Sequence, residues 1–212
     1  MSGAIKKNST TALLVLVAVL LTAFVAGRGP TVIAGTPANK AAAVGTTTQV
    51  AAPAQDVTLM TKTIRTSSPQ DLLFEVTAEC SIVTNVTTTG TDDQRAFGHI
   101  EMWVTFDGRP VLVGPDDSQA GRVVFCDRAY ERQTTFNQDD QDDAIATFFS
   151  TRSTHAFNWI LLNAGSGLHQ VQLHALLTAT ATNTATAEAV LGNRTIIISP
   201  AHFAQNADLV SN

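Results

Sequence analysis

Charged and aromatic side chains are scarce in this 212-residue chain. Asp, Glu, Lys and Arg make up 15% of it, against about 25% in ordinary soluble proteins. Aromatic residues make up 6%, with a single tyrosine, which argues against a dedicated aromatic platform for carbohydrate. Thr, Ala, Ser, Asn and Gln replace the missing charges. Such a surface favours exposed strands over exposed helices, because β-branched side chains fit a pleated sheet.

Familiar catalytic motifs are also missing. The chain has no Gly-rich phosphate loop, no HExxH and no CxxC. Gly165-Ser166-Gly167 is not a nucleophile elbow, because that motif joins a strand to a helix and this one leads into a strand-like run. Carboxylate pairs such as Glu75/Glu79 or Glu101/Asp127 have no specificity among eighteen acids. The sequence therefore leans away from an enzyme.

The charge balance is acidic, with a net charge of −5. Lys6, Lys7 and Arg28 lie near the N-terminus, where there is no acid. The rest of the chain has ten basic and eighteen acidic residues, a net charge of −8. Such a domain is repelled by phosphate backbones and by anionic lipid, which excludes nucleic acid as the expected partner.

The N-terminal segment has the pattern of an export signal. Two lysines precede Ala12–Val25, a run of fourteen residues without a charge. Apolar runs of about 10–14 residues are typical of the core of a signal peptide, whereas a spanning helix needs about 20. Small residues for cleavage occur at Val25/Gly27 and at Val32/Ala34. We expect residues 1–34 to be a signal peptide or, if uncleaved, a membrane-anchor helix, and the protein to be secreted or held at the cell surface.

Residues 35–56 are rich in Ala, Thr and Pro and have few large apolar side chains. They show neither a helical nor a strand period. Such a segment buries too little surface to offset its ordering entropy. We expect a disordered, flexible linker here, which either tethers the following domain or is only a spacer.

In residues 57–203, short strand-like runs alternate with clusters of turn residues, as is typical of an all-β domain. Leu72–Thr88 and Phe97–Phe106 alternate between apolar and polar residues, which is the pattern of half-buried strands. Asp107-Gly108 predicts a tight hairpin turn. Val111–Val113 follows as a strand-like run. Further strands are expected at Val57–Arg65, Arg122–Phe136, Ala144–Ser150 and Leu168–Thr180.

The remaining runs complete the predicted sheets. His155–Asn163 is apolar on both faces, which is typical of a central buried strand. A last strand pair is expected at Glu188–Leu191 and Arg194–Ser199, with its turn at Gly192-Asn193, and a loose tail at 204–212. These runs predict an antiparallel β-sandwich of about 8–10 strands, of immunoglobulin-like or jelly-roll-like architecture. A closed barrel is the alternative.

Cys80 and Cys126 are the only cysteines, and each falls on the apparent inward side of its strand. In an exported protein an even count favours one disulfide, which would close a loop of about 45 residues and add roughly 3–4 kcal/mol. Two free buried thiols are the alternative.

Four carboxylates crowd one loop, at Asp139, Asp140, Asp142 and Asp143. Carboxylate oxygens are the ligands that calcium prefers, and a cation would relieve their mutual repulsion. The spacing and glycine of an EF-hand are absent, so a solvated loop is the plainer interpretation. No other metal or cofactor is expected.

His99, Glu101 and Trp103 alternate along one predicted strand and share its polar face. They are candidates for a ligand-binding face, although polar surface pairs are the simpler interpretation. Asn85 and Asn193 each begin a glycosylation acceptor triplet.

The leading hypothesis is therefore an exported or surface-tethered β-sandwich that serves as a structural or adhesion-type interaction module without catalysis. Its partner would be a protein or glycan at a cell surface, or a second copy of the chain joined through a sheet edge. The alternatives are a calcium- or glycan-binding module centred on residues 139–143, and a secreted hydrolase without a recognisable motif.

Overall fold

The computed structural model describes residues 40–45, 48–50, 54–88, 93–114, 117–132 and 145–202. The chain divides into two compact units, Met1–Thr36 and Pro37–Asn212, and every described residue belongs to the second. The predicted export segment and the C-terminal tail 204–212 lie outside the described residues. Within the described part, no helix has the length and apolarity needed to span a bilayer.

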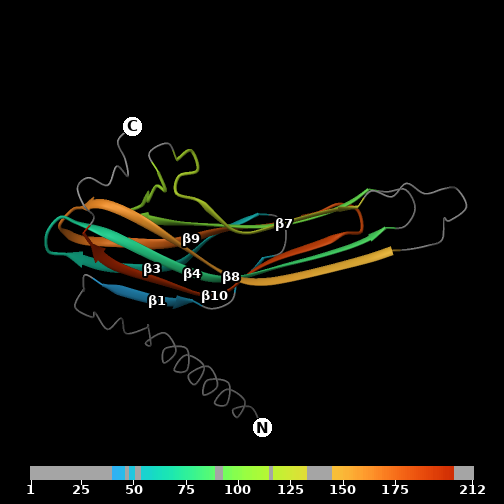
Figure 1. Cartoon of the computed structure of the whole chain (residues 1–212), viewed down its shortest axis with the longest axis horizontal. Coiled ribbons are helices and arrows are strands. Elements are labelled where there is room, and N and C mark those ends of the chain that lie inside the picture. Colours follow the sequence, from blue (N-terminus) through green and yellow to red (C-terminus); the bar gives the residue numbers. More distant parts are fainter. Residues whose placement is uncertain are drawn as a thin grey trace, which may run out of the picture. The chain divides into compact units, whose positions relative to one another are not determined.

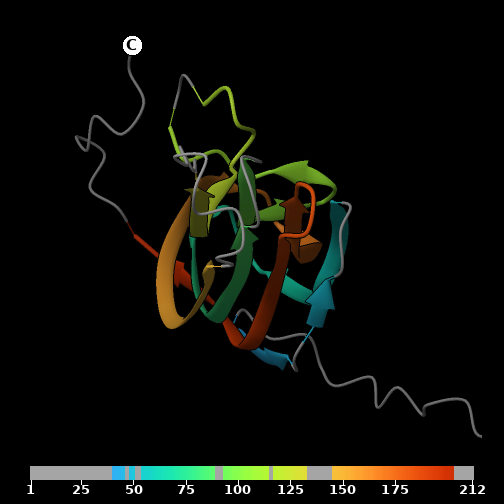
Figure 2. The same ribbon diagram turned by 90° about the vertical axis from the view of Figure 1, so that its right-hand side faces the viewer.

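The described residues form ten strands, and every pairing between these strands is antiparallel. Their packing in two sheets confirms the predicted β-sandwich (Figures 1 and 2). The strands are β1 (Ala41–Gly45), β2 (Thr48–Val50), β3 (Gln55–Thr66), β4 (Gln70–Thr88), β5 (Gln94–Phe106), β6 (Arg109–Pro110), β7 (Val123–Arg132), β8 (Ile145–Ala164), β9 (Gly167–Ala181) and β10 (Thr186–Ala201).

The first sheet has the order β1-β10-β4-β8, with the short strand β2 pairing on β10 as well. The second sheet has the order β3-β9-β5, and both β6 and β7 pair with β5 on the side away from β9. Within the described residues, each sheet therefore ends on both sides in strands that have a neighbour on one side only. We call these the first and second sheets below.

The core lies between the two sheets and follows the predicted alternation. On β4 the even-numbered apolar residues are buried, and on β5 and β9 the predicted inward residues are buried in the same way. The fully buried large side chains include Phe74, Ile82, Ile100, Met102, Leu173, Leu177 and Trp159. Burial of one face on each sheet provides the main hydrophobic stabilisation of a sandwich.

The expectation of a disordered linker at 35–56 is wrong for the described part of that range. Ala41–Gly45 pairs with β10 from Ile198 to Arg194, and Thr48–Val50 pairs with it from Leu191 to Ala189. Backbone hydrogen bonds to β10 hold these strands, and such bonds do not depend on large side chains. A poor apolar content therefore did not prevent strand formation.

His155–Asn163 is not a central strand, which corrects the sequence interpretation. Together with Ile145–Thr154 it forms one continuous 20-residue strand, β8, and β4 is the one described strand that pairs with it. β8 is an edge strand of the first sheet, and it runs along β4 in yellow to orange in Figure 1. The prediction rested on the apolar residues that 155–163 present on both faces. Which strands become neighbours depends on pairing between distant segments, and local composition does not encode it.

Two further turns differ from expectation. Gly192-Asn193 is not a hairpin turn, because the residues on both sides of it pair with β4 and the register shifts between Leu191 and Arg194. It is a β-bulge within the single strand β10. Val111–Val113 is not a strand, and only Arg109–Pro110 pairs after the turn. The Asp107-Gly108 turn itself is confirmed, with φ of 50° and 77° as a type I′ turn requires.

Candidate functional site

The three residues of the predicted ligand face lie on the outer side of the second sheet. His99, Glu101 and Trp103 alternate on β5 with the buried Ile100 and Met102, so their side chains point away from the first sheet. This parity is the one expected from the sequence. The three residues are therefore brought together, and their surroundings decide what they can bind.

Trp103 is only 7% exposed although it lies on the outer face. The guanidinium of Arg122 lies 4.2 Å from the centre of its ring. His174, the partner of Trp103 on β9, stacks on it with centroids 5.3 Å apart and planes 8° from parallel. Because these two side chains cover the indole, it does not present an open aromatic face to a sugar.

His174 is held between hydroxyl groups on both sides. Its Nδ1 lies 3.2 Å from Thr58 Oγ1 on β3, and its Nε2 lies 3.1 Å from Thr105 Oγ1 on β5. Desolvation lowers the pKa of His174 below its usual 6.5, and the nearby charge of Asp56 offsets part of this effect. A neutral imidazole is therefore favoured, linking three adjacent strands across the outer face.

Glu101 and His99 belong to a chain of paired charges. The Glu101 carboxylate lies 3.3 Å from Arg122 Nη1 and 3.2 Å from His99 Nε2. His99 Nδ1 lies 3.7 Å from the carboxylate of Asp127 on β7. Arg122 therefore compensates the charge of Glu101 within the protein, whereas His99 contributes a charge to this cluster only when its ring is protonated.

An open depression of about 590 Å³ lies beside this cluster, where the loop from Val111 to Arg122 approaches β7 and β8. Its apolar lining consists of Val113, Val123, Val124 and Phe157. Asp117 lies in the loop, and backbone N–H groups of Val113, Gln119 and Gly121 donate to it at 3.0, 2.8 and 2.6 Å. The bond from Val113 contributes most to lowering the pKa of Asp117, and burial opposes it.

These contacts give Asp117 a structural role. Its carboxylate accepts three backbone hydrogen bonds and so shapes the loop, as Asp side chains commonly do in turns. The sequence predicted neither this role nor the cover that Arg122 provides for Trp103. Neither contact has a local sequence signal, because each depends on how the loop folds.

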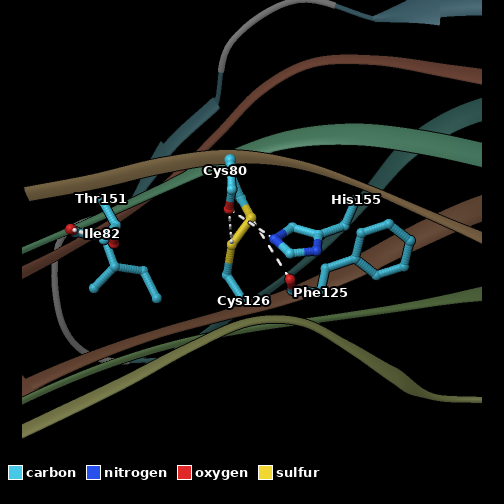
Figure 3. The surroundings of a disulfide bond; sticks show 7 residues. Cys80, Ile82, Phe125, Cys126, Thr151 and His155 are labelled. Carbon is cyan, nitrogen blue, oxygen red and sulfur yellow. Dashed lines mark hydrogen bonds between the residues drawn. A yellow bond between two sulfur atoms is a disulfide. The ribbon is translucent and has the colours of Figure 1, made fainter.

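The predicted disulfide between Cys80 and Cys126 is present, and it joins β4 of the first sheet to β7 of the second (Figure 3). Its Cα atoms are 6.4 Å apart. The ring of His155 lies beside the two sulfur atoms, and its Nε2 is 2.7 Å from Ser153 Oγ. The disulfide is therefore a covalent link across the core, close to the β7 and β8 edges.

One cluster of potential metal ligands surrounds the disulfide. Among the described residues, Cys80, Cys126 and His155 form the one group of three His, Cys, Asp or Glu side chains close enough to share an ion. Both sulfurs of that group are joined in the disulfide and are not thiolate ligands. The acidic residues Asp139–Asp143 lie outside the described residues, so the calcium hypothesis stays a prediction.

A second polar cluster closes one end of the sandwich. His169 Nδ1 lies 2.8 Å from a carboxylate oxygen of Asp107, and its Nε2 lies 2.9 Å from the carbonyl of Gly165. The other Asp107 oxygen accepts the backbone N–H of Gln170 at 2.8 Å. Phe106 stacks on the His169 ring with centroids 4.6 Å apart. These contacts tie the β5–β6 turn to the β8–β9 turn, which gives His169 a structural role.

No protein-family model matches the chain, and neither does any curated protein. Among solved structures, it is similar to a chain from the structure of infectious bursal disease virus Gt strain, at 11% identity and a TM-score of 0.29. It is also similar to a mutant VP2 protein of that virus in derived T=1 particles, at 11% identity and a TM-score of 0.22. These matches cover 82% of this chain but only 37% and 39% of the other chains. At such scores the likeness carries no argument, and the fold assignment rests on the strand pairing alone.

Proposed function

We propose that this protein is an exported β-sandwich that acts outside the cell or at its surface as a structural or interaction module. The observation that supports it most directly is that, among the described strands, those at the sheet edges have a paired neighbour on one side only. An unpaired strand edge offers a row of backbone donors and acceptors to another chain. A protein partner can form backbone hydrogen bonds with such an edge. A glycan is less favoured as the partner, because the ring of Trp103 is covered and cannot stack on a sugar.

The disulfide supports the proposed location. Disulfides form and persist in oxidising compartments and are rare in the cytosol. Cys80 and Cys126 link the two sheets through the core, so the bond stabilises the whole sandwich. Together with the fourteen-residue apolar run after Lys6 and Lys7, this favours export.

Export is tested with the full chain and a Val17→Arg variant, in which a charge interrupts the apolar run. In whole cells, an added protease should digest the wild-type sandwich, and cysteines should resist alkylation until a reductant is added. The variant should be retained with both thiols reactive. Retention of the wild-type chain inside the cell with reduced cysteines would contradict the proposal.

The interaction role is tested on the same cells with a membrane-impermeant amine cross-linker. Discrete products larger than the single chain are expected in the wild type. If the exported chain gives no product at any dose, it is not an interaction module.

A further inference from the structure

The sandwich has edges on both sides of each sheet, and most of them are protected against pairing with another chain. β1 and β2, at one edge of the first sheet, are only five and three residues long. β3, at one edge of the second sheet, has a register shift between Thr58 and Met60. It also carries Asp56, Lys62 and Arg65. Short length, irregular register and charge each oppose the addition of a further strand.

β7, at the opposite edge of the second sheet, is protected in the same way. The register of its pairing with β5 shifts between Ile100 and Glu101. Four of its ten residues are charged: Asp127, Arg128, Glu131 and Arg132.

β8 has little of this protection, because the one register shift in its pairing with β4 lies at its C-terminal end, between Leu161 and Ala164. It is 20 residues long and contains neither proline nor glycine. Its register with β4 is unbroken from Leu161 to Ile145. Its single residue of fixed charge, Arg152, forms an ion pair with Glu79 on the outer face of its own sheet. Among the described residues, no strand pairs with the side of β8 that faces away from β4.

Exposed apolar side chains gather along this same edge. Phe148, Phe149 and Leu162 of β8 are 64%, 40% and 37% exposed. Val124 on the neighbouring edge strand β7 is 52% exposed, and Val113 in the adjoining loop is 46% exposed. A long backbone edge bordered by apolar side chains is the combination expected of a strand that another chain covers.

We propose that the β8 edge pairs antiparallel with the β8 edge of a second copy of this chain, so that the first sheets of two copies become one continuous sheet. This proposal rests on the proposed interaction role and names its partner. An antiparallel strand can pair with its own copy across a two-fold axis, in which case both copies use the same surface.

Charge favours a second copy in this antiparallel arrangement. Arg152 is already paired with Glu79, so two β8 strands meet without an uncompensated charge on either. In the sequence, the four acids Asp139–Asp143 come just before β8. Antiparallel pairing places the beginnings of the two strands at opposite ends of the ladder, whereas parallel pairing would bring these acids side by side.

The available area is also sufficient. At about 3.3 Å per residue, a 20-residue strand is about 65 Å long. With side chains an edge is about 10 Å thick, so full pairing covers roughly 650 Å² on each copy. A specific interface needs about 1,000 Å² in total, or about 500 Å² on each copy. Pairing over most of β8 meets this requirement.

The test measures the mass of the full chain by size-exclusion chromatography with light scattering, in one buffer or detergent for all variants. The edge variant is Ser150→Lys/Thr154→Lys, two exposed positions on either side of Arg152. It places three positive charges in one row near the middle of β8, where an antiparallel copy of β8 would bring the same three charges close to them. The matched control is Thr61→Lys/Thr63→Lys, which builds the same stripe beside Arg65 on the β3 edge.

The wild type and the β3 variant should have the mass of two chains, and the β8 variant should have the mass of one at the same concentration. Circular dichroism and urea midpoints check that all three are folded. Hydrogen exchange gives a second readout, because β8 amides should exchange at least tenfold more slowly in the wild type than in the β8 variant.

A wild-type monomer, an assembly larger than two chains, or a β8 variant that stays dimeric would each overturn the proposal. Loss of the dimer in the β3 variant would do the same. These failures are separable from failure of the proposed function. An exported chain that cross-links only to other proteins keeps the interaction role but loses the self-pairing.

Discussion

Reducing the disulfide between Cys80 and Cys126 should substantially lower the free energy of unfolding. The two cysteines are 46 residues apart in the sequence. In the chain-entropy account, a cross-link that closes a loop of this length destabilises the unfolded chain by about 4 kcal/mol at 25 °C. A typical domain has a free energy of unfolding of about 5–15 kcal/mol, so this loss is large but does not by itself abolish folding.

Urea unfolding followed by tryptophan fluorescence measures the effect, because Trp159 is buried beside Phe125, the neighbour of Cys126. With a slope of about 2 kcal/mol/M in urea, a loss of about 4 kcal/mol lowers the midpoint by about 2 M. The slope should not fall, since the reduced unfolded chain is more expanded. Cys80→Ala/Cys126→Ala is the control, and in the absence of reductant it should unfold near the midpoint of the reduced wild type.

A midpoint shift below about 0.5 M, which corresponds to about 1 kcal/mol, would refute the reasoning. It would mean that the unfolded chain is already restricted between β4 and β7, or that the bond strains the folded sandwich. An alanine variant much less stable than the reduced wild type would instead assign the effect to lost packing around Cys80, which is buried.

Three further predictions follow from single side chains, and a fourth from the acidic sequence Asp139–Asp143. Trp159→Phe removes the indole N–H that donates to the carbonyl of Gly121 at 2.8 Å, and urea unfolding should show a loss of about 1–3 kcal/mol. Burial raises the pKa of Asp107 but hydrogen bonds, first from His169, outweigh it, so its net pKa lies below 3.8. The ionised Asp107 therefore stabilises the fold above pH 3.8, and this stabilisation is lost as the pH falls through its lowered pKa. In acid unfolding, the Asp107→Asn variant should not show this loss of stability. Desolvation lowers the pKa of His174, so the stability it confers is lost as pH falls below 6.5, and His174→Gln should flatten the urea midpoint between pH 7 and 5. If Asp139–Asp143 bind calcium, the ion should raise the melting temperature of the wild type but not of a variant with asparagine at the four aspartates.

The sequence predicted the inward faces of β4, β5 and β9 because a half-buried strand has a side-chain period of two. Phe74, Met102 and Leu173 are all buried as that period requires. It also predicted the Asp107-Gly108 turn and the Cys80–Cys126 disulfide, which depend on positive φ and on inward parity. The strand faces and the turn are encoded locally, within a few residues, whereas the disulfide joins cysteines 46 residues apart and was predicted mainly from their even count.

Features that depend on which strands are neighbours could not be predicted in this way. Ala41–Gly45 has too few large side chains to show a strand pattern, yet it adds to β10 through its backbone. Gly192-Asn193 has the composition of a hairpin turn, but both flanking segments pair with β4, which makes it a bulge. The same limit applies to Trp103, since the Arg122 that covers it lies nineteen residues further along the chain.

The distribution of charge among the strands strengthens the argument about β8. Across the edge strands β3 and β7, seven of 22 residues carry a fixed charge. The central strand β9 has none in 15 residues, and the central strand β10 has two in 16. β8 has one in 20, so its composition is that of a strand with neighbours on both sides. Because the other long edge strands, β3 and β7, are charged, the low charge content of the whole chain does not explain why β8 carries so few charges. The scarcity of charge on β8 is instead what a strand requires when its second neighbour comes from another molecule.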